Sequence, residues 1–307
     1  GAASHAKPKS RASAQALERG GDVGLAAVVG QTTAVKALHN YIVEPFKHLV
    51  AERSAAKRDS GSVIAAFDLP LGILLCGPPG AGKTHLAVQL ASELGAHVFA
   101  AAPADILAAR VGEAEKRMAA LFESARRCAP SAVILEDVDA MVAADADDPL
   151  EAEAGSETRA GLVLRSELDT LRLRRAAHQK LREGGQRFPL ASEALVLVIA
   201  TACEESRVAG WLLAPHRLSR TIELEPRLTE EAVAELLRRS LDGKVDDPAC
   251  IVAAAASLCN KGKGSGAAAA AFCRAAATQA VRRHISSLQC MGMPEVLDQE
   301  HMRPVGL

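Results

Sequence analysis

Several features that would identify a particular class of protein are missing from this sequence. It has no pair of cysteines at C-x-x-C spacing and no histidine cluster at metal-ligand spacing, so neither a zinc site nor a disulfide framework is expected. No run of about 18 apolar residues occurs, and the first residues contain Ser, Lys and Arg without the apolar core of a secretory signal. We therefore expect a soluble, intracellular protein with no transmembrane segment, in the cytoplasm or, as alternatives, in the nucleus or at an organelle surface.

An excess of charge of one sign is also missing. The 307 residues include 36 basic and 37 acidic side chains, for a net charge of -1. Such a fold does not attract nucleic acid or an anionic membrane as a whole, and we do not expect a nucleic-acid partner. Charge is local instead, in an acidic run at 145–157 and a basic run at 172–187. These runs predict solvated faces or loops, with an element that docks a partner or touches a polynucleotide as the alternative.

A phosphate-binding loop lies between a predicted strand and a predicted helix. The apolar run 71–76 stops at a glycine, as a buried parallel strand does, and LAVQLASEL after the loop has helical periodicity. The pattern G-x-x-x-x-G-K-T between them would place backbone N–H groups around a phosphate chain at a helix N-terminus. Lys83 would supply a cation to the β- and γ-phosphates, and the Thr84 hydroxyl would ligate Mg²⁺. The candidate nucleotide-binding residues of the loop are Gly77, Pro78, Pro79, Gly80, Ala81, Gly82, Lys83, Thr84 and His85.

Two adjacent carboxylates follow another apolar run. In AVILEDVDAM the predicted strand 132–135 delivers Glu136 and Asp137 at its C-terminal end, where open α/β sheets bind ligands. The pair is therefore expected to face the phosphate loop. In ATPases that have such a phosphate loop, one carboxylate holds Mg²⁺, usually through water, and the next carboxylate orients the attacking water. Glu136 is the candidate metal-side group together with Thr84, and both carboxylates are candidate catalytic residues.

The order of elements predicts an α/β fold of the P-loop NTPase type with a second, smaller domain. Strands are expected at 71–77, 97–102, 132–135, 194–202 and 220–225, and the text after Arg227 is helical only, with Thr229 as a cap. We predict a disordered basic tail at 1–22, a nucleotide-binding domain at 23–227 and a helical domain at 228–307. Charged insertions in the nucleotide-binding domain are expected at 142–158 and 172–194.

With these motifs in place, the chain resembles an ATPase module of the classical AAA clade (AAA+), the group of valosin-containing protein, the peroxins and spastin. GILLCGPPGAGKTHLA resembles the family's Walker A segment, and VGEAEKRMAALFESARRCAPSAVILEDVDAM resembles the stretch through Walker B. VLVIATACEESRVAGWLLAPHRLSRTIEL aligns without gaps to the sensor-1 and arginine-finger region, and GSGAAAAAFCRAAATQAVRRH aligns to the lid helix.

The resemblance implies a five-stranded parallel sheet of order 5-1-4-3-2, a helical lid, and a homo- or hetero-hexameric ring with ATP and Mg²⁺ between subunits. It also implies mechanical work on protein substrates or adaptors. Adenine would lie against Val28 and Val29 and against the start of the lid helix at Gly266 and Ala267. Because the chain stops where family members begin their final lid helix, we expect a lid truncated at its C-terminus, within a longer protein.

The chain departs from the family pattern mainly at hydrolytic positions. The family order of Asp then Glu becomes Glu136 then Asp137, and the sensor-1 Asn becomes Cys203, a weak hydrogen-bonding group. The first of two trans-acting arginines aligns with Ala214, whereas the second aligns with Arg217. Two further departures are Arg110 in place of the aromatic pore residue and Ala27 in place of the Asp of the adenine-side turn.

Three hypotheses remain open from the sequence. The first is an ATPase, possibly slow, that remodels or unfolds proteins. It depends on the presence of the residues for hydrolysis, which are Lys83, Thr84, Glu136, Asp137 and one trans arginine. The second is a nucleotide-binding, hydrolysis-impaired structural subunit or ring of a larger assembly. The third is a nucleic-acid remodeller, which depends only on the basic tail and the basic run at 172–187.

Overall fold

The computed structural model describes residues 24–48, 69–107, 112–142, 159–183, 195–241, 248–262 and 264–290. The expected tail at 1–22, the acidic run at 145–157, Arg110 and the C-terminal end of the chain lie outside these residues. The chain divides into two compact units between Leu228 and Thr229. Each unit is described by itself.

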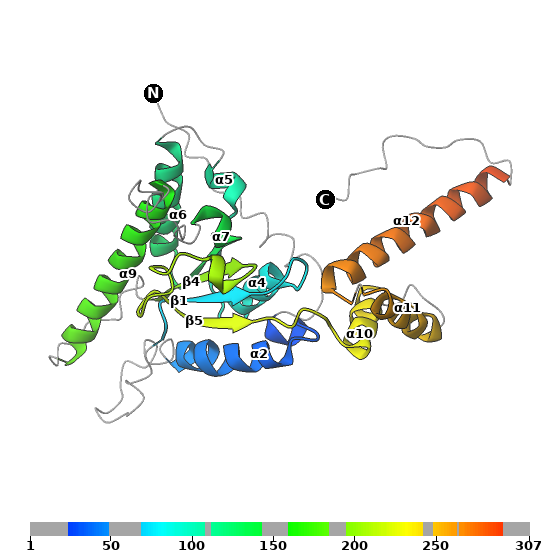
Figure 1. Ribbon diagram of the computed structural model, residues 1–307, viewed down its shortest axis with the longest axis horizontal. Helices are drawn as coiled ribbons and strands as arrows, with labels where there is room; N and C mark the ends of the chain where they lie inside the picture. The colour runs from blue at the N-terminus through cyan, green and yellow to red at the C-terminus, as the bar shows by residue number, and fades with distance from the viewer. Residues whose placement is uncertain are drawn as a thin grey trace. The chain divides into compact units, whose positions relative to one another are not determined.

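The first unit is built on a five-stranded parallel sheet (Figure 1). The strands are β1 (Gly72–Cys76), β2 (His97–Ala101), β3 (Ser131–Leu135), β4 (Val196–Ala202) and β5 (Leu218–Glu223). Their order is β2-β3-β4-β1-β5, which confirms the predicted order 5-1-4-3-2. The central strands β1, β3 and β4 are buried along their whole length. This explains why they appear in the sequence as continuous apolar runs.

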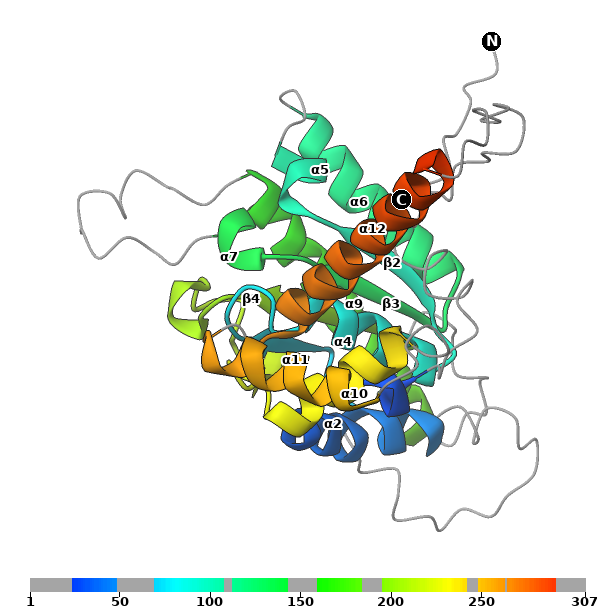
Figure 2. The same cartoon turned by 90° about the vertical axis from the view of Figure 1, so that its right-hand side faces the viewer.

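Helices cover both faces of the sheet. Successive side chains of β1 point to opposite faces, so Leu74 and Cys76 belong to one apolar core and Ile73 and Leu75 to the other. The first core is closed by α6 (Glu113–Arg127) and α9 (Arg159–Glu183), and the second by α2 (Thr32–Leu38) and α4 (Lys83–Glu93). Figures 1 and 2 both show α6 and α2 on opposite sides of the sheet. The shorter elements are η1 (Leu25–Ala27), η2 (His39–Val43), α5 (Pro103–Leu107), α7 (Val138–Met141) and η5 (Glu205–Arg207).

Helix α9 runs further than the helical pattern in the sequence indicates. Its apolar stripe of Ala160, Leu164, Leu168 and Leu171 is buried, and the helix then continues through the basic residues to Glu183. Arg175 stabilises this extension because its guanidinium donates to the carbonyls of Leu69, Pro70 and Val196 at 3.0, 3.2 and 2.5 Å. Residues 172–183, which the sequence assigned to a charged insertion, are therefore a continuation of the helix.

The second unit contains the predicted C-terminal helices, α10 (Glu230–Ser240), α11 (Pro248–Asn260) and α12 (Gly266–Cys290). Thr229 caps α10 as predicted, since its hydroxyl accepts a hydrogen bond from the Ala232 N–H at 3.3 Å. In the part of the chain that the structure describes, no helix is long and apolar enough to cross a membrane.

Candidate active site

The loop between β1 and α4 has the conformation that the glycine pattern requires. Gly80 and Gly82 have φ angles of 83° and 98°, in the left-handed region that glycine adopts without strain. The Gly77 N–H donates to the Ala202 carbonyl at 3.2 Å, which fixes the start of the loop against the end of β4. Helix α4 then begins at Lys83, so the unpaired N–H groups of its first turn lie at the loop. This arrangement is suited to binding phosphate.

Lys83 lies within the loop rather than on the surface. Its side chain is 8% exposed, and its ammonium donates to the carbonyls of Gly77 at 2.7 Å and Pro78 at 3.3 Å. A cation held there is available to phosphate oxygens entering the loop. Of the other candidates, Ala81 is buried, Pro78 and Thr84 are half-buried, and Pro79 and His85 are exposed.

Glu136 and Asp137 lie at the C-terminal end of β3, which pairs with β4. Asp137 is the N-cap residue of α7 with φ 43° and ψ 56°, and its N–H donates to the Thr201 hydroxyl of β4 at 3.0 Å. Asp tolerates this left-handed conformation better than Glu, because its short side chain can bond locally. The local backbone therefore offers a physical reason for Asp at the second position of the pair.

The carboxyl of Glu136 is half-buried. Burial raises its pKa, and repulsion from Asp137 and then Asp105 raises it further. A nearby cation would relieve this penalty, because an opposite charge favours the ionised carboxylate.

A third carboxylate, which the sequence interpretation did not single out, lies beside this pair. Asp139 is 9% exposed, and its Oδ2 accepts a hydrogen bond from the Cys203 N–H at 3.3 Å. Its Oδ1 is buried with no hydrogen-bond partner among the described residues. Asp139 thus ties the segment that carries the sensor-position cysteine to the turn after β3. The only sequence signal for it is a second acidic residue two positions after Asp137.

The residues present fit ATP and Mg²⁺. The described residues include no group of three or more His, Cys, Asp or Glu side chains placed to hold a metal ion alone. Mg²⁺ is commonly held by one or two carboxylates together with waters and substrate phosphates, so a phosphate loop and a carboxylate pair at the same edge of one sheet are a suitable donor set. Thr84 in the first turn of α4 and Glu136 would supply the protein ligands, directly or through water.

The residues expected near adenine fall in two places. Val28 and Val29 are half-buried in the segment 24–31, which packs on α4 through η1. Gly266 and Ala267 begin α12 in the second unit, where Gly266 is half-buried and Ala267 is exposed.

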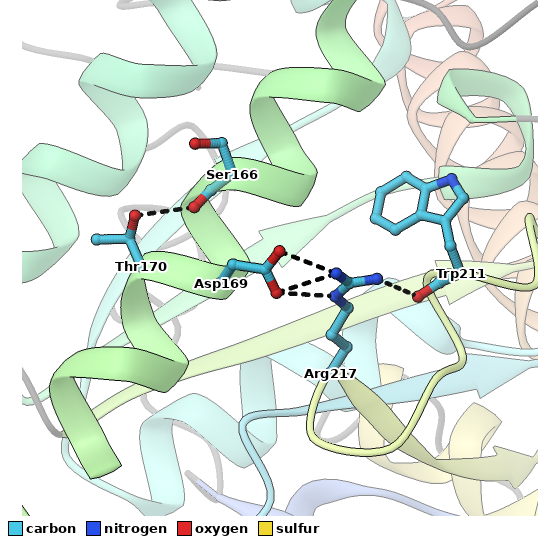
Figure 3. Close-up of polar contacts among 5 residues, drawn as sticks. All are labelled: Ser166, Asp169, Thr170, Trp211 and Arg217. Atoms are coloured by element: carbon cyan, nitrogen blue, oxygen red, sulfur yellow. Dashed lines mark hydrogen bonds and ion pairs between the residues drawn. The ribbon is translucent and has the colours of Figure 1, made fainter. Parts of the chain in front are cut away.

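Arg217 is bound inside its own chain (Figure 3). Its Nη2 donates to both oxygens of Asp169 at 3.0 and 2.9 Å, its Nε donates to Oδ1 at 3.2 Å, and its Nη1 donates to the Trp211 carbonyl at 2.8 Å. The guanidinium carbon also lies 5.4 Å from the centroid of the Trp211 ring. The side chain of Arg217 is 13% exposed. To act on a neighbouring subunit, Arg217 would first have to leave Asp169.

Comparison with known proteins agrees with this geometry. The profile of the family described as "ATPase family associated with various cellular activities (AAA)" matches residues 73–226. The ATPase family protein 2 homolog of Caenorhabditis elegans is 31% identical over 224 residues, which are 72% of this chain and 27% of that protein. The cell division cycle protein 48 homolog of Archaeoglobus fulgidus is 31% identical over 220 residues, 70% of this chain and 26% of that protein.

A third relative carries a different description. A protein of Arabidopsis thaliana named "Probable inactive ATP-dependent zinc metalloprotease FTSHI 2, chloroplastic" is 37% identical over 125 residues, 41% of this chain and 13% of that protein. The chain thus spans roughly a quarter or less of the length of these relatives. Residues 73–226 are just over half of the 307 residues, and they include the phosphate loop and the carboxylate pair. The chain therefore belongs to the AAA family of ATPases.

Proposed function

We propose that this chain binds MgATP at the loop 77–84 and hydrolyses it slowly, as one module of a homo- or hetero-hexameric ring that remodels or unfolds proteins. The observation that carries the proposal is the position of the Lys83 ammonium inside a glycine-shaped loop, at the edge of the sheet where β3 also ends, with β4 between them, and delivers Glu136 and Asp137. Membership of the AAA family supports the ATPase activity, and the assembly is the one that the resemblance to the classical AAA clade implies.

Each residue has a separate task in this proposal. The loop N–H groups and Lys83 bind the phosphates, and Thr84 and Glu136 hold the metal. When bound, Mg²⁺ neutralises charge on the phosphate oxygens. Asp137 accepts a hydrogen bond from the attacking water and orients it, and Cys203 occupies the place beside that water. Arg217 would stabilise charge on the γ-phosphate of a neighbouring subunit.

Slow hydrolysis follows from the length of the side chains at the carboxylate pair. Asp137 is one methylene shorter than Glu, so its carboxylate lies about 1.5 Å further from a water placed for a Glu. A misplacement of about 1 Å can reduce the rate of an in-line displacement ~10²-fold. The weak hydrogen-bonding capacity of the Cys203 thiol acts in the same direction.

Two variants test this proposal. Lys83→Ala should raise the Kd of a fluorescent ATP analogue at least tenfold, because the phosphates lose their cation, whereas the melting temperature should fall only slightly. The double exchange Glu136→Asp with Asp137→Glu should raise kcat by roughly ten- to a hundredfold with little change in nucleotide Kd. It should also cost about 1 kcal/mol of stability, because it places Glu in the left-handed conformation. Faster hydrolysis by the natural order than by the exchanged one would contradict this account of the pair.

A nucleotide-binding, hydrolysis-impaired subunit is the second candidate. The bidentate ion pair of Arg217 with Asp169 favours it, because this arginine is already committed within its own chain. Magnesium-dependent phosphate release from the purified protein separates the two candidates. Tight ATP binding without release, unchanged by the double exchange, would support the impaired subunit.

A further inference from the structure

The segment 24–31 is attached at one end to helix α4 and at the other end to the phosphate loop. At one end the Gly24 N–H donates to the Gln89 side-chain carbonyl of α4 at 2.9 Å. At the other end Gln31, which is 3% exposed, forms hydrogen bonds with Ala81 and Glu225. The half-buried residues Val28 and Val29 lie between these two attachments.

Gln31 uses both polar atoms of its carboxamide. Its Oε1 accepts from the Glu225 N–H at 2.9 Å, and its Nε2 donates to the Glu225 carbonyl at 3.1 Å. The same Nε2 donates to the Ala81 carbonyl of the phosphate loop at 3.5 Å. A carboxamide is the neutral side-chain group that accepts and donates in this way, so neither Met nor an ionised Glu reproduces the three contacts.

These contacts place the segment 28–30 beside the loop. Gln31 follows directly on Gly30, and it joins the chain there to Ala81, two residues before Lys83. A nucleotide whose phosphates lie in the loop extends its ribose and base beyond the loop, and the segment 28–30 is one of the chains that border the loop. The tether through Gln31 holds such a bordering chain in place at Val28 and Val29.

We infer that Gln31 is a positioning residue for the nucleoside part of ATP, acting through the segment 28–30 rather than by touching the phosphates. The inference rests on the proposed nucleotide site. Loss of the carboxamide should loosen the segment that borders the base, while the loop N–H groups and Lys83 still bind phosphate. Loss of the carboxamide should therefore lower the affinity for ATP and leave the affinity for a bare phosphate chain unchanged.

The test is isothermal titration of the full chain with MgATP and with magnesium tripolyphosphate, a probe that has three phosphates and no nucleoside. Gln31→Met keeps the length of the side chain and removes its hydrogen bonds. We expect its Kd for ATP to rise about tenfold and its Kd for tripolyphosphate to stay within about twofold of the parent value.

Ser131→Ala is the matched control. Ser131 is fully buried at the start of β3, and its hydroxyl donates to the Ala125 carbonyl at 2.8 Å. Its loss removes a buried hydrogen bond at the opposite end of the strands from the loop. The control should lower the melting temperature without changing either Kd.

Two results would overturn the inference: an unchanged ATP affinity in folded Gln31→Met, or an equal loss for ATP and tripolyphosphate. If Gln31→Met does not fold, Gln31→Asn keeps a carboxamide that is one methylene too short for Glu225 and Ala81, and the same criteria apply to it. Failure of the parent chain to bind ATP at all would instead contradict the proposed function.

Discussion

Among the residues that the structure describes, Glu136 has a carboxyl whose charge is disfavoured by its position in the fold. Its pKa is raised in the folded chain by burial and by Asp137 and Asp105, so the folded state binds this proton more tightly than the unfolded state does. The contribution of Glu136 to the stability of the fold is therefore most favourable below the ordinary pKa of a Glu side chain. This contribution is lost as the pH rises from that value through the raised pKa.

The substitution Glu136→Gln removes this penalty. We expect it to stabilise the fold at pH 7 to 8 by about 0.5 kcal/mol and to have little effect below pH ~4, where both states are protonated. Urea unfolding at the two pH values measures this difference. Glu113→Gln is the control, because Glu113 is 52% exposed in an ion pair with Arg117 and should show no such gain. A gain from Glu136→Gln that is equal at both pH values would contradict the electrostatic explanation.

His216 is a residue with backbone strain. It is exposed, with a φ of 70°, in the left-handed region where the Cβ of any L residue crowds the following carbonyl oxygen. We expect His216→Gly to raise the free energy of unfolding by about 0.5 kcal/mol, since the relieved strain exceeds the added entropy of the unfolded chain. His216→Val should lower it by about 1 kcal/mol or more, because a β-branched residue fits this φ poorly. Thermal unfolding of the two variants should therefore shift in opposite directions.

At the scale of elements, the ion pair of Arg217 and Asp169 joins α9 to the loop before β5. Asp169 lies on α9, next to Leu168 of the buried stripe, while Arg217 directly precedes the first residue of β5. The pair is bidentate, and the two side chains are 13% and 35% exposed, so it is better shielded from water than a surface pair.

We expect Asp169→Asn to destabilise the fold by about 2 kcal/mol, because it leaves the Arg217 charge partly buried without a counter-ion. The comparison is Glu123→Gln, which removes a carboxylate from the pair with Arg127 whose side chains are 56% and 76% exposed. That change should cost less than about 0.5 kcal/mol. Trp211, the single tryptophan of the chain, reports on the same contact through its fluorescence, since the guanidinium lies against its ring. Equal losses in the free energy of unfolding would mean that the pair of Asp169 and Arg217 stabilises the fold no more than an exposed ion pair does.

For the whole molecule, the proposed ring requires Arg217 to leave Asp169 if this arginine is to act on a neighbouring subunit. An Arg217→Ala chain keeps its own phosphate loop, and a Lys83→Ala chain keeps its Arg217. If the arginine acts across a subunit boundary, each variant alone should be inactive, and a mixture should recover part of the ATPase activity. An arginine finger contributes on the order of 10³-fold or more, so recovery is measurable even in a slow enzyme.

Phosphate release measured across mixing ratios, with assembly followed by light scattering, provides this test. Mixed assemblies without recovery at any ratio would indicate that Arg217 remains with Asp169. Arg217 would then be a structural residue, and a different chain would have to supply the arginine. The control is the ATPase activity of each variant alone, measured at the total protein concentration of the mixture.

Much of the fold and of the phosphate site could be predicted from the sequence alone. The loop 77–84 depends on glycine conformations, a following helix and a preceding apolar strand, all of which are local in the chain. The carboxylates after β3 follow from the same logic, because parallel strands end at one edge of a sheet. The order of the five strands came from the resemblance to a family rather than from periodicity.

The side-chain contacts around the proposed site join distant parts of the chain and could not be found in the sequence. Arg217 meets Asp169 across 48 residues, Asp139 meets Cys203 across 64, and Gln31 meets Glu225 across 194. No local pattern marks such partners, because each contact forms only after helices have packed on a sheet whose strand order differs from the chain order. The groups proposed to bind phosphate could be found in the sequence, since they lie within a few residues of one another. The conformation of Arg217 and the tether at Gln31 were decided by packing, because their partners are distant in the chain and adjacent only in the folded protein.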